Sequence, residues 1–356
     1  MSPKDDRSNR RSSRLPFVLA ACLTALLVLP CPAETPCVFT GVDKIVAVGD
    51  LHGDFENFVK ILLGTKLVDQ DLHWTAGRTH LVQVGDILDR GPSARKIFDL
   101  LIQLEKEAEQ AGGRVHVLLG NHEEMALAGI SFDYPGYVTL PQFLSFIPED
   151  YLDAKQTEFV KKRMAGLPVG LEPPTIPYTE IQEYWKGLMQ NNEEAQQKYF
   201  ESLRSRYGPW LLGRNAVIKI NDIIFVHGGI SERFSKIPLE KINADLRYEL
   251  ELAMRGAKFR PRIMYAPNGP LWYRDLANND ESMTGEVDRV LANLKARRMV
   301  VGHSPHGFGT LGTMERFGGR IFVIDTGISA HYGGHYSALI IENQNFVSWG
   351  VSFGAK

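Results

Sequence analysis

The chain has very little cysteine, and all of it lies near one end. Its 356 residues include only Cys22, Cys31 and Cys37. Cleavage after Ala33, which the N-terminal pattern predicts, would leave Cys37 alone, so the mature chain would have no internal disulfide and no zinc site of four cysteines. No cysteine lies beyond residue 37 to act as a nucleophile. The sequence therefore excludes thiol chemistry in the body of the chain.

The chain also lacks a block of basic residues. Its formal net charge is −2, and because the first 33 residues hold five basic and two acidic side chains, −5 is left for the remainder. A mildly acidic body of this kind does not suit electrostatic binding to a nucleic-acid backbone. We therefore expect no nucleic-acid partner.

The N-terminal apolar run, residues 15–30, is short for a membrane helix. A membrane span needs about 20 residues, and this run also holds Pro16 and Pro30. Basic residues precede the run and Cys31-Pro32-Ala33 follows it, which is the order found in a signal peptide that is cleaved after Ala33. We expect a signal peptide over residues 1–33 and export to the periplasm or the exterior. An uncleaved anchor, which would hold the chain on a membrane, is the alternative.

The remaining chain alternates short apolar runs with helical periodicity, which is typical of an α/β fold. The expected strands cover residues 44–48, 79–84, 115–119, 216–226 (a hairpin turning at Asn221-Asp222), 299–301, 321–324, 338–341 and 346–351. The last three of these are expected to form an antiparallel meander. The expected helices cover residues 54–64, 93–111, a segment through Met125 and Leu127, 150–165, 179–205 and 239–255.

A stretch from about residue 129 to 213 interrupts this alternation. It is rich in proline, tyrosine, glutamine and glutamate. We interpret it as a helical insertion in one catalytic domain that spans residues 34–356. Periodicity alone leaves open whether the insertion borders the functional site or is an ordinary subdomain.

Five of the apolar strands each end in a polar, glycine-containing cluster. The clusters are Gly49-Asp50-Leu51-His52-Gly53, Gly85-Asp86-Ile87-Leu88-Asp89-Arg90-Gly91, Gly120-Asn121-His122-Glu123, His227-Gly228-Gly229 and Gly302-His303. Loops at the carboxyl ends of strands in an α/β sheet meet at one crevice, so these side chains should lie together. Oxygen and imidazole ligands of this kind suit Mn²⁺, Fe or Zn²⁺, and two ions ~3.5–4 Å apart would clamp a phosphoryl group during in-line displacement.

The order of the clusters is far more specific than any one of them, since Gly-Asp and Gly-Asn alone are common turns. The series resembles the phosphoprotein phosphatases of the calcineurin-like metallophosphoesterases, over most of residues 44–304 outside the insertion. This resemblance implies a β-sandwich core of mixed sheets flanked by helices. The Ser-Ala-Pro-Asn-Tyr element of common eukaryotic serine/threonine phosphatases is absent, and Ile324-Asp325-Thr326-Gly327-Ile328-Ser329 stands in its region. Together with Gly269-Pro270-Leu271-Trp272-Tyr273-Arg274, this looks more like the Shewanella-like protein phosphatases.

The resemblance also implies the ligands of two divalent metal ions, with manganese expected and iron or zinc as alternatives. The first ion would be bound by Asp50 and His52, both ions by Asp86, and the second ion by Asn121, His227 and His303. A bridging carboxylate offsets charge between two close cations, and a water whose pKa both ions lower would attack phosphorus.

Four further residues receive roles from the same resemblance. His122 would be the general acid that protonates the leaving alkoxide, and Asp89 would orient its ring. Arg90 would bind phosphate oxygens through its planar guanidinium, and Arg274 is the candidate for a second phosphate contact.

Other polar residues near the C-terminus are left outside the predicted site. His306, His331 and His335 lie in glycine-rich loops, where most histidines are structural or solvated. Asp325 follows a strand and is a candidate hydrogen-bond partner for a ligand histidine, but it is not counted in the site.

The function expected from these residues is a metal-dependent phosphatase acting on phosphoserine, phosphothreonine or phosphotyrosine, in a phosphorylated protein or a small phosphoester. One alternative is a dinucleoside tetraphosphatase, which shares the metal motifs; the acidic Asp89 before Arg90-Gly91 favours the protein phosphatase. A second alternative is a non-catalytic scaffold with the same fold. It is disfavoured because every expected ligand and the candidate acid are present.

Overall fold

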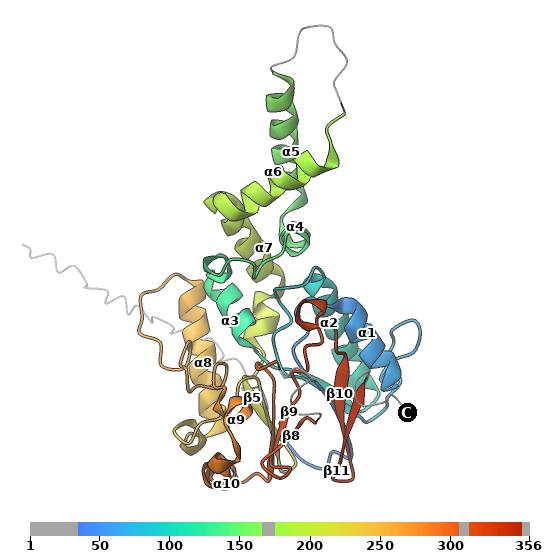
Figure 1. Ribbon diagram of the computed structural model, residues 1–356, viewed down its shortest axis with the longest axis vertical. Helices are drawn as coiled ribbons and strands as arrows, with labels where there is room; N and C mark the ends of the chain where they lie inside the picture. Colours follow the sequence, from blue (N-terminus) through green and yellow to red (C-terminus); the bar gives the residue numbers. More distant parts are fainter. Residues whose placement is uncertain (1–34, 166–174, 306–312, 351–356) are drawn as a thin grey trace, which may run out of the picture. The chain divides into compact units, whose positions relative to one another are not determined.

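The computed structural model describes residues 35–165, 175–305 and 313–350 (Figure 1). The predicted signal peptide and His306 lie outside these ranges. No helix within them is long and apolar enough to cross a membrane.

Eleven strands in the described chain form two sheets. The first has six strands, in the order β1 (Val38–Phe39), β5 (Val217–Ile220), β6 (Ile223–Val226), β7 (Arg298–Val301), β9 (Ile321–Val323) and β8 (Glu315–Arg316). The second has five strands, in the order β11 (Asn345–Gly350), β10 (Ser337–Glu342), β2 (Lys44–Val48), β3 (His80–Gln83) and β4 (Arg114–Val117). Both sheets are mixed: β2, β3 and β4 run parallel, as do β6, β7 and β9, while the remaining neighbours include antiparallel pairs.

Side chains of the two sheets meet in one continuous hydrophobic core. The ring of Phe322 on β9 stacks on that of Phe346 on β11, with centroids 4.6 Å apart. The central strands are near-continuous apolar runs because both of their faces are covered, and Val46, Ala47 and Val48 of β2 are fully buried. The predicted β-sandwich of mixed sheets is confirmed.

Helices flank the sheets, and most begin and end where the sequence predicts. They are α1 (Phe55–Gly64), α2 (Ala94–Gln110), α3 (Asn121–Ala128), α8 (Leu239–Met254), α9 (Asp275–Asn278) and α10 (Thr284–Asn293). Asp54 caps α1 by accepting a hydrogen bond from the Asn57 backbone N–H at 3.0 Å. The apolar face of α2 is buried as predicted, with Ile97, Leu101 and Leu104 inaccessible to solvent.

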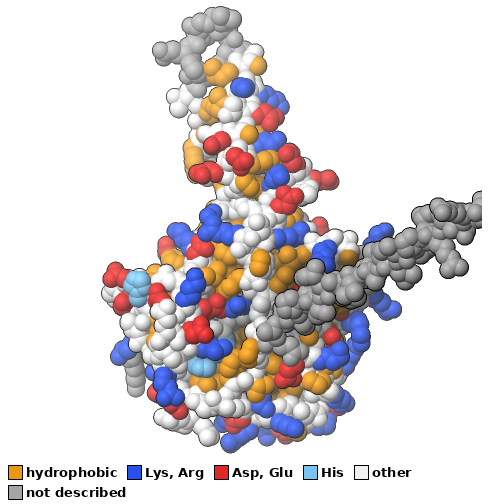
Figure 2. Space-filling model, turned by 180° about the vertical axis from the view of Figure 1, so that it is seen from behind, with side chains coloured by type: hydrophobic (Ala, Val, Ile, Leu, Met, Phe, Trp, Pro, Cys, Tyr) orange, Lys and Arg blue, Asp and Glu red, His pale blue; other side chains and the backbone are white. Residues whose placement is uncertain are grey.

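The described part of the insertion contains four α-helices, of which α5 and α6 extend away from the sheets (Figure 1). They are α4 (Leu140–Phe146), α5 (Glu149–Met164), α6 (Tyr178–Asn191) and α7 (Glu193–Leu212). The single helix predicted over residues 179–205 is wrong, because the chain leaves the helical conformation at Asn192, whose side chain caps α7 by accepting from the Ala195 N–H at 2.8 Å. The helix α5 buries no residue, and Figure 2 shows acidic and basic side chains mixed over this part of the insertion.

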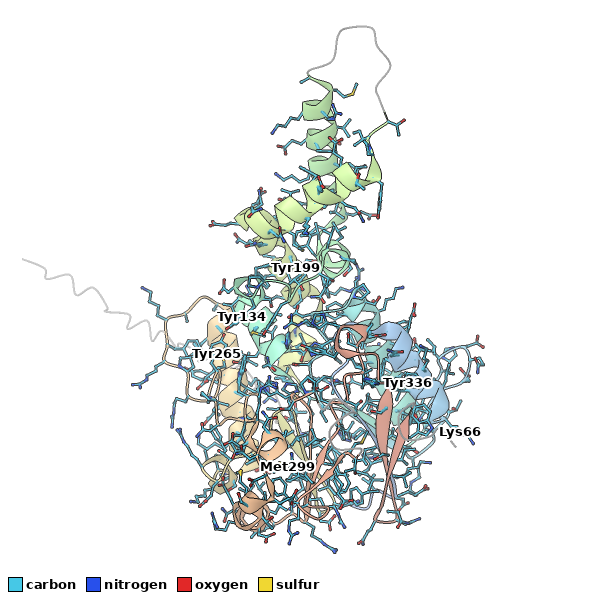
Figure 3. All side chains as sticks on the ribbon, in the orientation of Figure 1. Lys66, Tyr134, Tyr199, Tyr265, Met299 and Tyr336 are labelled. Atoms are coloured by element: carbon cyan, nitrogen blue, oxygen red, sulfur yellow. The ribbon has the colours of Figure 1, made fainter. Side chains whose placement is uncertain are left out.

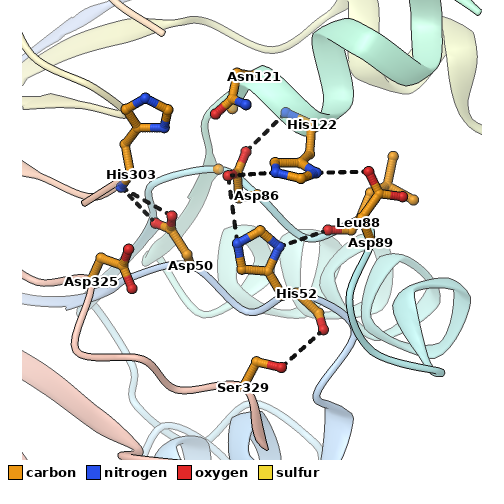
Figure 4. Close-up of polar contacts among 12 residues, drawn as sticks. Asp50, His52, Asp86, Leu88, Asp89, Asn121, His122, His303, Asp325 and Ser329 are labelled. Carbon is orange, nitrogen blue, oxygen red and sulfur yellow. Dashed lines mark hydrogen bonds and ion pairs between the residues drawn. The ribbon is translucent and has the colours of Figure 1, made fainter. Parts of the chain in front are cut away.

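The predicted C-terminal meander is also wrong. Of the three strands in that prediction, only β10 and β11 pair with each other, whereas β9 lies in the other sheet, between β7 and β8. Short apolar runs carry no information about which sheet they join. The chain between β9 and β10 crosses from one sheet to the other and brings Asp325 and Ser329 close to the strand ends discussed next (Figure 4).

Candidate metal centre

Five strand ends, three from one sheet and two from the other, bring the predicted ligands together. The loops after β2, β3, β4 and β7 bring their ligands close to Asp86 (Figure 4), and the loop after β6 brings His227 within 3.3 Å of it. All six predicted ligands are buried, with exposed fractions of 0–4%: Asp50, His52, Asp86, Asn121, His227 and His303. Glycine is required at two of these ends, because a Cβ on Gly120 would collide with Asp86 Oδ1 and one on Gly302 with Asp50 Oδ1.

One group of ligand atoms surrounds His227 Nε2. This nitrogen lies 2.9 Å from Asn121 Oδ1, 3.1 Å from His303 Nδ1 and 3.3 Å from Asp86 Oδ1. The other ring nitrogen, Nδ1, lies 2.9 Å from the Val84 carbonyl oxygen, which fixes its proton there and leaves a lone pair on Nε2. Lone pairs therefore converge on one point, which is the arrangement that a bound cation would satisfy.

A second group forms on the other oxygen of Asp86. His52 Nε2 lies 3.7 Å and His122 Nε2 3.8 Å from Asp86 Oδ2. The Nδ1 of His52 lies 3.0 Å from the Leu88 carbonyl oxygen, so its Nε2 also carries a lone pair directed at the centre. Ligand atoms of His52, Asp86 and His122 lie within 4.8 Å of one another, as do those of Asp86, His227 and His303. Asp86 is thus common to both groups, as a bridging ligand requires.

Asp50 lies beside these two groups rather than within either. Its two carboxylate oxygens accept hydrogen bonds from the His303 backbone N–H at 3.1 and 3.0 Å. Its role as a ligand of the first ion stays a prediction. Burial, followed by the nearby carboxylates of Asp325 and Asp86, raises the pKa of Asp50 well above its ordinary value. Several buried carboxylates this close together need a positive charge among them.

The pKa shifts of His52 and His303 favour the neutral form that binds metals. Burial lowers the pKa of His52 to about 4, with His122 adding to the effect. Burial also lowers the pKa of His303 well below its ordinary value, and His227 and Arg274 lower it further. Asp86 behaves in the opposite way: burial alone would raise its pKa, but His227, His122 and His52 outweigh burial and hold it well below its ordinary value. The residues present therefore fit a divalent metal site.

His122 pairs with the carboxylate predicted to orient it. Its Nδ1 lies 2.7 Å from Asp89 Oδ2, and both side chains are buried. Burial alone would lower the pKa of His122, but Asp86 and Asp89 outweigh it and raise the pKa above its ordinary value. The ring also stacks on Tyr137 of the insertion, with centroids 4.7 Å apart. His122 can thus hold a proton on the nitrogen that faces the centre.

Both predicted arginines lie next to the centre. The Arg90 guanidinium lies 4.0 Å from the ring centroid of Tyr137, and its buried Nε has no hydrogen-bond partner. Arg274 lies on the surface, but its Nη1 donates to the His303 carbonyl oxygen and, at 3.3 Å, to Ser304 Oγ. The Arg90 guanidinium therefore lies near His122, since both contact the Tyr137 ring, and the Arg274 guanidinium lies against His303.

The structure adds residues that the motif roles did not include. The buried carboxylate of Glu123 fixes the loop that carries Asp86, since it accepts backbone N–H groups of Asp86, Ile87, Leu88 and Gly120 at 2.8–3.1 Å. The sequence already contained an indication of this role, because Glu123 belongs to the third polar cluster, Gly120-Asn121-His122-Glu123. Asp325 bonds no ligand histidine: its Oδ1 accepts from the Gly327 N–H, its Oδ2 has no partner, and burial raises its pKa to about 6.

Of the histidines left outside the predicted site, His331 and His335 belong to neither ligand group among the described residues. His331 is exposed in the short helix Ala330–Tyr332, next to Tyr332, whose ring lies 5.2 Å from that of His52.

Residues 43–335 match the family of calcineurin-like phosphoesterases. The chain belongs to this family. It is 30% identical to Shewanella-like protein phosphatase 2 of Arabidopsis thaliana over 307 residues, which cover 82% of this chain and 73% of the relative. It is 29% identical to Shewanella-like protein phosphatase 1 of Plasmodium berghei (strain Anka) over 300 residues, which cover 82% and 70%.

A solved structure agrees with this assignment. The cold-active protein-tyrosine phosphatase of a psychrophilic Shewanella is 25% identical, with a TM-score of 0.61 over 90% of this chain and 81% of that chain. The predicted membership of the Shewanella-like protein phosphatases is confirmed. The calcineurin-like phosphoesterases are hydrolases, and the buried cluster of histidines and aspartates fits the divalent metal site that such an enzyme uses.

Proposed function

We propose that this chain is an exported, metal-dependent protein phosphatase that hydrolyses phosphate monoesters. The observation that supports it most directly is the position of Asp86. Its two oxygens lie in two separate groups of ligand atoms, and the same carboxylate lies 3.8 Å from the Nε2 of His122. Residues that would hold two ions and the candidate proton donor His122 thus lie next to one another, an arrangement suited to hydrolysis of a monoester.

In this proposal, some residues of the site bind the phosphate group and others transfer a proton to the leaving group. Two divalent ions, which we propose to be manganese, would supply positive charge to the phosphate oxygens and lower the pKa of the attacking water. Arg90 and Arg274 would bind the remaining phosphate oxygens through their guanidinium groups. As the bond between phosphorus and the leaving oxygen breaks, His122 would give its Nε2 proton to that oxygen, while Asp89 holds the Nδ1 proton of the ring.

The surroundings of His122 favour phosphotyrosine over phosphoserine and phosphothreonine. Tyr137 stacks on His122, and Tyr134, which is 40% exposed, stacks on Tyr137 with centroids 5.0 Å apart. This row of rings leads from the solvent to the proton donor, and aromatic rings stack well on one another. The name of the similar Shewanella structure, a protein-tyrosine phosphatase, agrees with this preference.

A substrate panel tests the proposal. With added Mn²⁺, we expect kcat/KM to be highest for phosphotyrosine peptides, lower for matched phosphoserine and phosphothreonine peptides, and lowest for diadenosine tetraphosphate. A higher value for the dinucleotide than for every phosphopeptide would identify a dinucleoside tetraphosphatase instead. Purified protein that holds no stoichiometric transition metal and is inert toward p-nitrophenyl phosphate would support the second alternative, a non-catalytic scaffold with the same fold.

Export rests on the N-terminal sequence alone. If the signal peptide is cleaved after Ala33, the protein recovered from the exported fraction should begin at Glu34, and intact-mass spectrometry measures this directly. A full-length chain in the membrane fraction would instead support the uncleaved anchor, and a full-length chain in the cytosol would contradict export.

A further inference from the structure

Asp89 has a second partner besides His122. Its Oδ2 faces the His122 ring, and its Oδ1 accepts a hydrogen bond from Gln142 Nε2 at 2.9 Å. Gln142 Oε1 in turn accepts the Asp89 backbone N–H at 2.8 Å. The amide of Gln142 is therefore oriented unambiguously, because the carboxylate needs a donor and the N–H needs an acceptor.

A tyrosine holds the other side of this amide. Gln142 Nε2 also donates to the hydroxyl oxygen of Tyr199, at 2.8 Å. Asp89, Gln142 and Tyr199 are all completely buried. Gln142 belongs to α4 and Tyr199 to α7, so both come from the insertion, and Figure 3 shows Tyr199 where the insertion joins the rest of the domain.

The same segment of the insertion also fixes the backbone next to the acid. Asp89 and Arg90 have φ angles of 69° and 67°, which are unfavourable for residues other than glycine. Beside the bond from Asp89 to Gln142, the Arg90 N–H donates to the Tyr137 carbonyl oxygen at 2.8 Å, and the Thr139 hydroxyl donates to the Gly91 carbonyl oxygen at 3.0 Å. Three consecutive residues of the second motif are thus each bound to residues 137–142.

We propose that Gln142 and Tyr199 are positioning residues for the proton donor, acting on His122 through Asp89. Without the Gln142 donor, the Asp89 carboxylate is free to rotate and no longer holds one oxygen on His122 Nδ1. The ring that carries a proton on each nitrogen would then lose the acceptor on Nδ1 that orients its Nε2–H toward the centre. The insertion would on this view support the acid, which goes beyond the two roles left open by the sequence. The inference rests on the proposed function of His122 as the acid.

The alternative is that these residues only pack the insertion onto the domain. The two views differ in what a substitution does to different substrates. Substitution of a residue that acts through the acid should slow turnover of esters with poor leaving groups. It should spare p-nitrophenyl phosphate, whose leaving group needs little protonation. Substitution of a residue that only stabilises the fold should change the turnover of all substrates alike.

Two variants and one control separate these views. Gln142→Met keeps the volume and removes the three hydrogen bonds of the amide, and Tyr199→Phe keeps the ring and removes the hydroxyl. Tyr207→Phe is the control, because Tyr207 is a buried tyrosine on the same helix whose hydroxyl donates to Asp99 Oδ1 at 2.6 Å, outside the site. Melting temperature and metal content are measured for all three.

For alkyl phosphate monoesters we expect kcat to fall roughly 10- to 100-fold in Gln142→Met and about 2- to 10-fold in Tyr199→Phe. Turnover of p-nitrophenyl phosphate should stay within about 3-fold of the wild type. Tyr207→Phe should leave the ratio of the two rates unchanged. If Gln142→Met fails to fold, Tyr199→Phe alone decides the result.

A double variant separates this inference from the function on which it rests. In the His122→Asn background, Gln142→Met should slow alkyl monoesters no further, since its effect passes through the missing imidazole. Equal slowing of both substrates by Gln142→Met or Tyr199→Phe, or a full further loss in that background, would overturn the positioning role. If His122→Asn itself slows both substrates equally, the acid role of His122 fails instead.

Discussion

Replacing Asp86 by asparagine is expected to remove the bound metal and nearly all turnover together. Asp86 is the one carboxylate common to both groups of ligand atoms, with Oδ1 3.3 Å from His227 Nε2 and Oδ2 3.7 Å from His52 Nε2. An amide would remove the negative charge that two ions would share in the proposed centre, and would place a donor where an ion would need a lone pair. We expect kcat for p-nitrophenyl phosphate to fall roughly 10³-fold or more.

Elemental analysis of the purified variant checks the first half of this result, and steady-state kinetics with added Mn²⁺ checks the second. Asp222→Asn is a matched control, because Asp222 lies in the β5–β6 turn, where it pairs with Arg297 at 3.5 Å. A variant at position 86 that keeps two ions per chain, or that keeps wild-type turnover, would show that Asp86 does not bridge the ions.

The substitution His122→Asn is expected to separate chemistry from metal binding. The His122 Nδ1 is held by Asp89 at 2.7 Å and its Nε2 faces the centre, so loss of the ring removes a proton donor. We expect turnover of alkyl monoesters to fall by roughly 10²- to 10⁴-fold and that of p-nitrophenyl phosphate by much less, because a good leaving group needs little help from an acid. Metal content and melting temperature should stay close to those of the wild type.

His122 also lies among the possible ligand atoms of the first ion, which makes metal content the deciding measurement. Loss of one ion per chain would identify His122 as a ligand, and equal slowing of alkyl and aryl esters would exclude it as the acid. His116→Asn is the control, since His116 is likewise buried but pairs with His80 at 3.0 Å on β3 and β4, outside both ligand groups.

Part of the insertion borders the site, which is one of the two roles that the sequence left open. Its helix α5 buries nothing, whereas residues 137–142 bind the loop of the second motif directly. Substitutions in α5 should therefore matter less for proton transfer than substitutions near Gln142. The proposed preference for phosphotyrosine would link the neighbouring rings of Tyr134 and Tyr137 to the choice of substrate.

The sequence by itself determined the elements whose pattern is local. The strands β2, β3 and β4 and the helices α1, α2 and α3 follow from apolar runs and their periodicity. The inventory of the site was also readable, because the polar clusters follow apolar strands in an order that turns alone do not explain. Five strand ends then had to meet, and they do meet around Asp86.

Only the tertiary structure decided what depends on contacts between distant segments. The strand β9 joins the sheet of β7 although its apolar run looks like those of β10 and β11. Nothing in the sequence around Gln142 or Tyr199 sets them apart from other polar residues of helices. Yet Gln142 reaches Asp89 across 53 residues of chain, and Tyr199 reaches Gln142 across 57. Hydrophobic periodicity predicts which face of an element is buried, but not which element packs against that face. A single hydrogen bond between two side chains produces no periodic pattern in the sequence, so periodicity does not predict it.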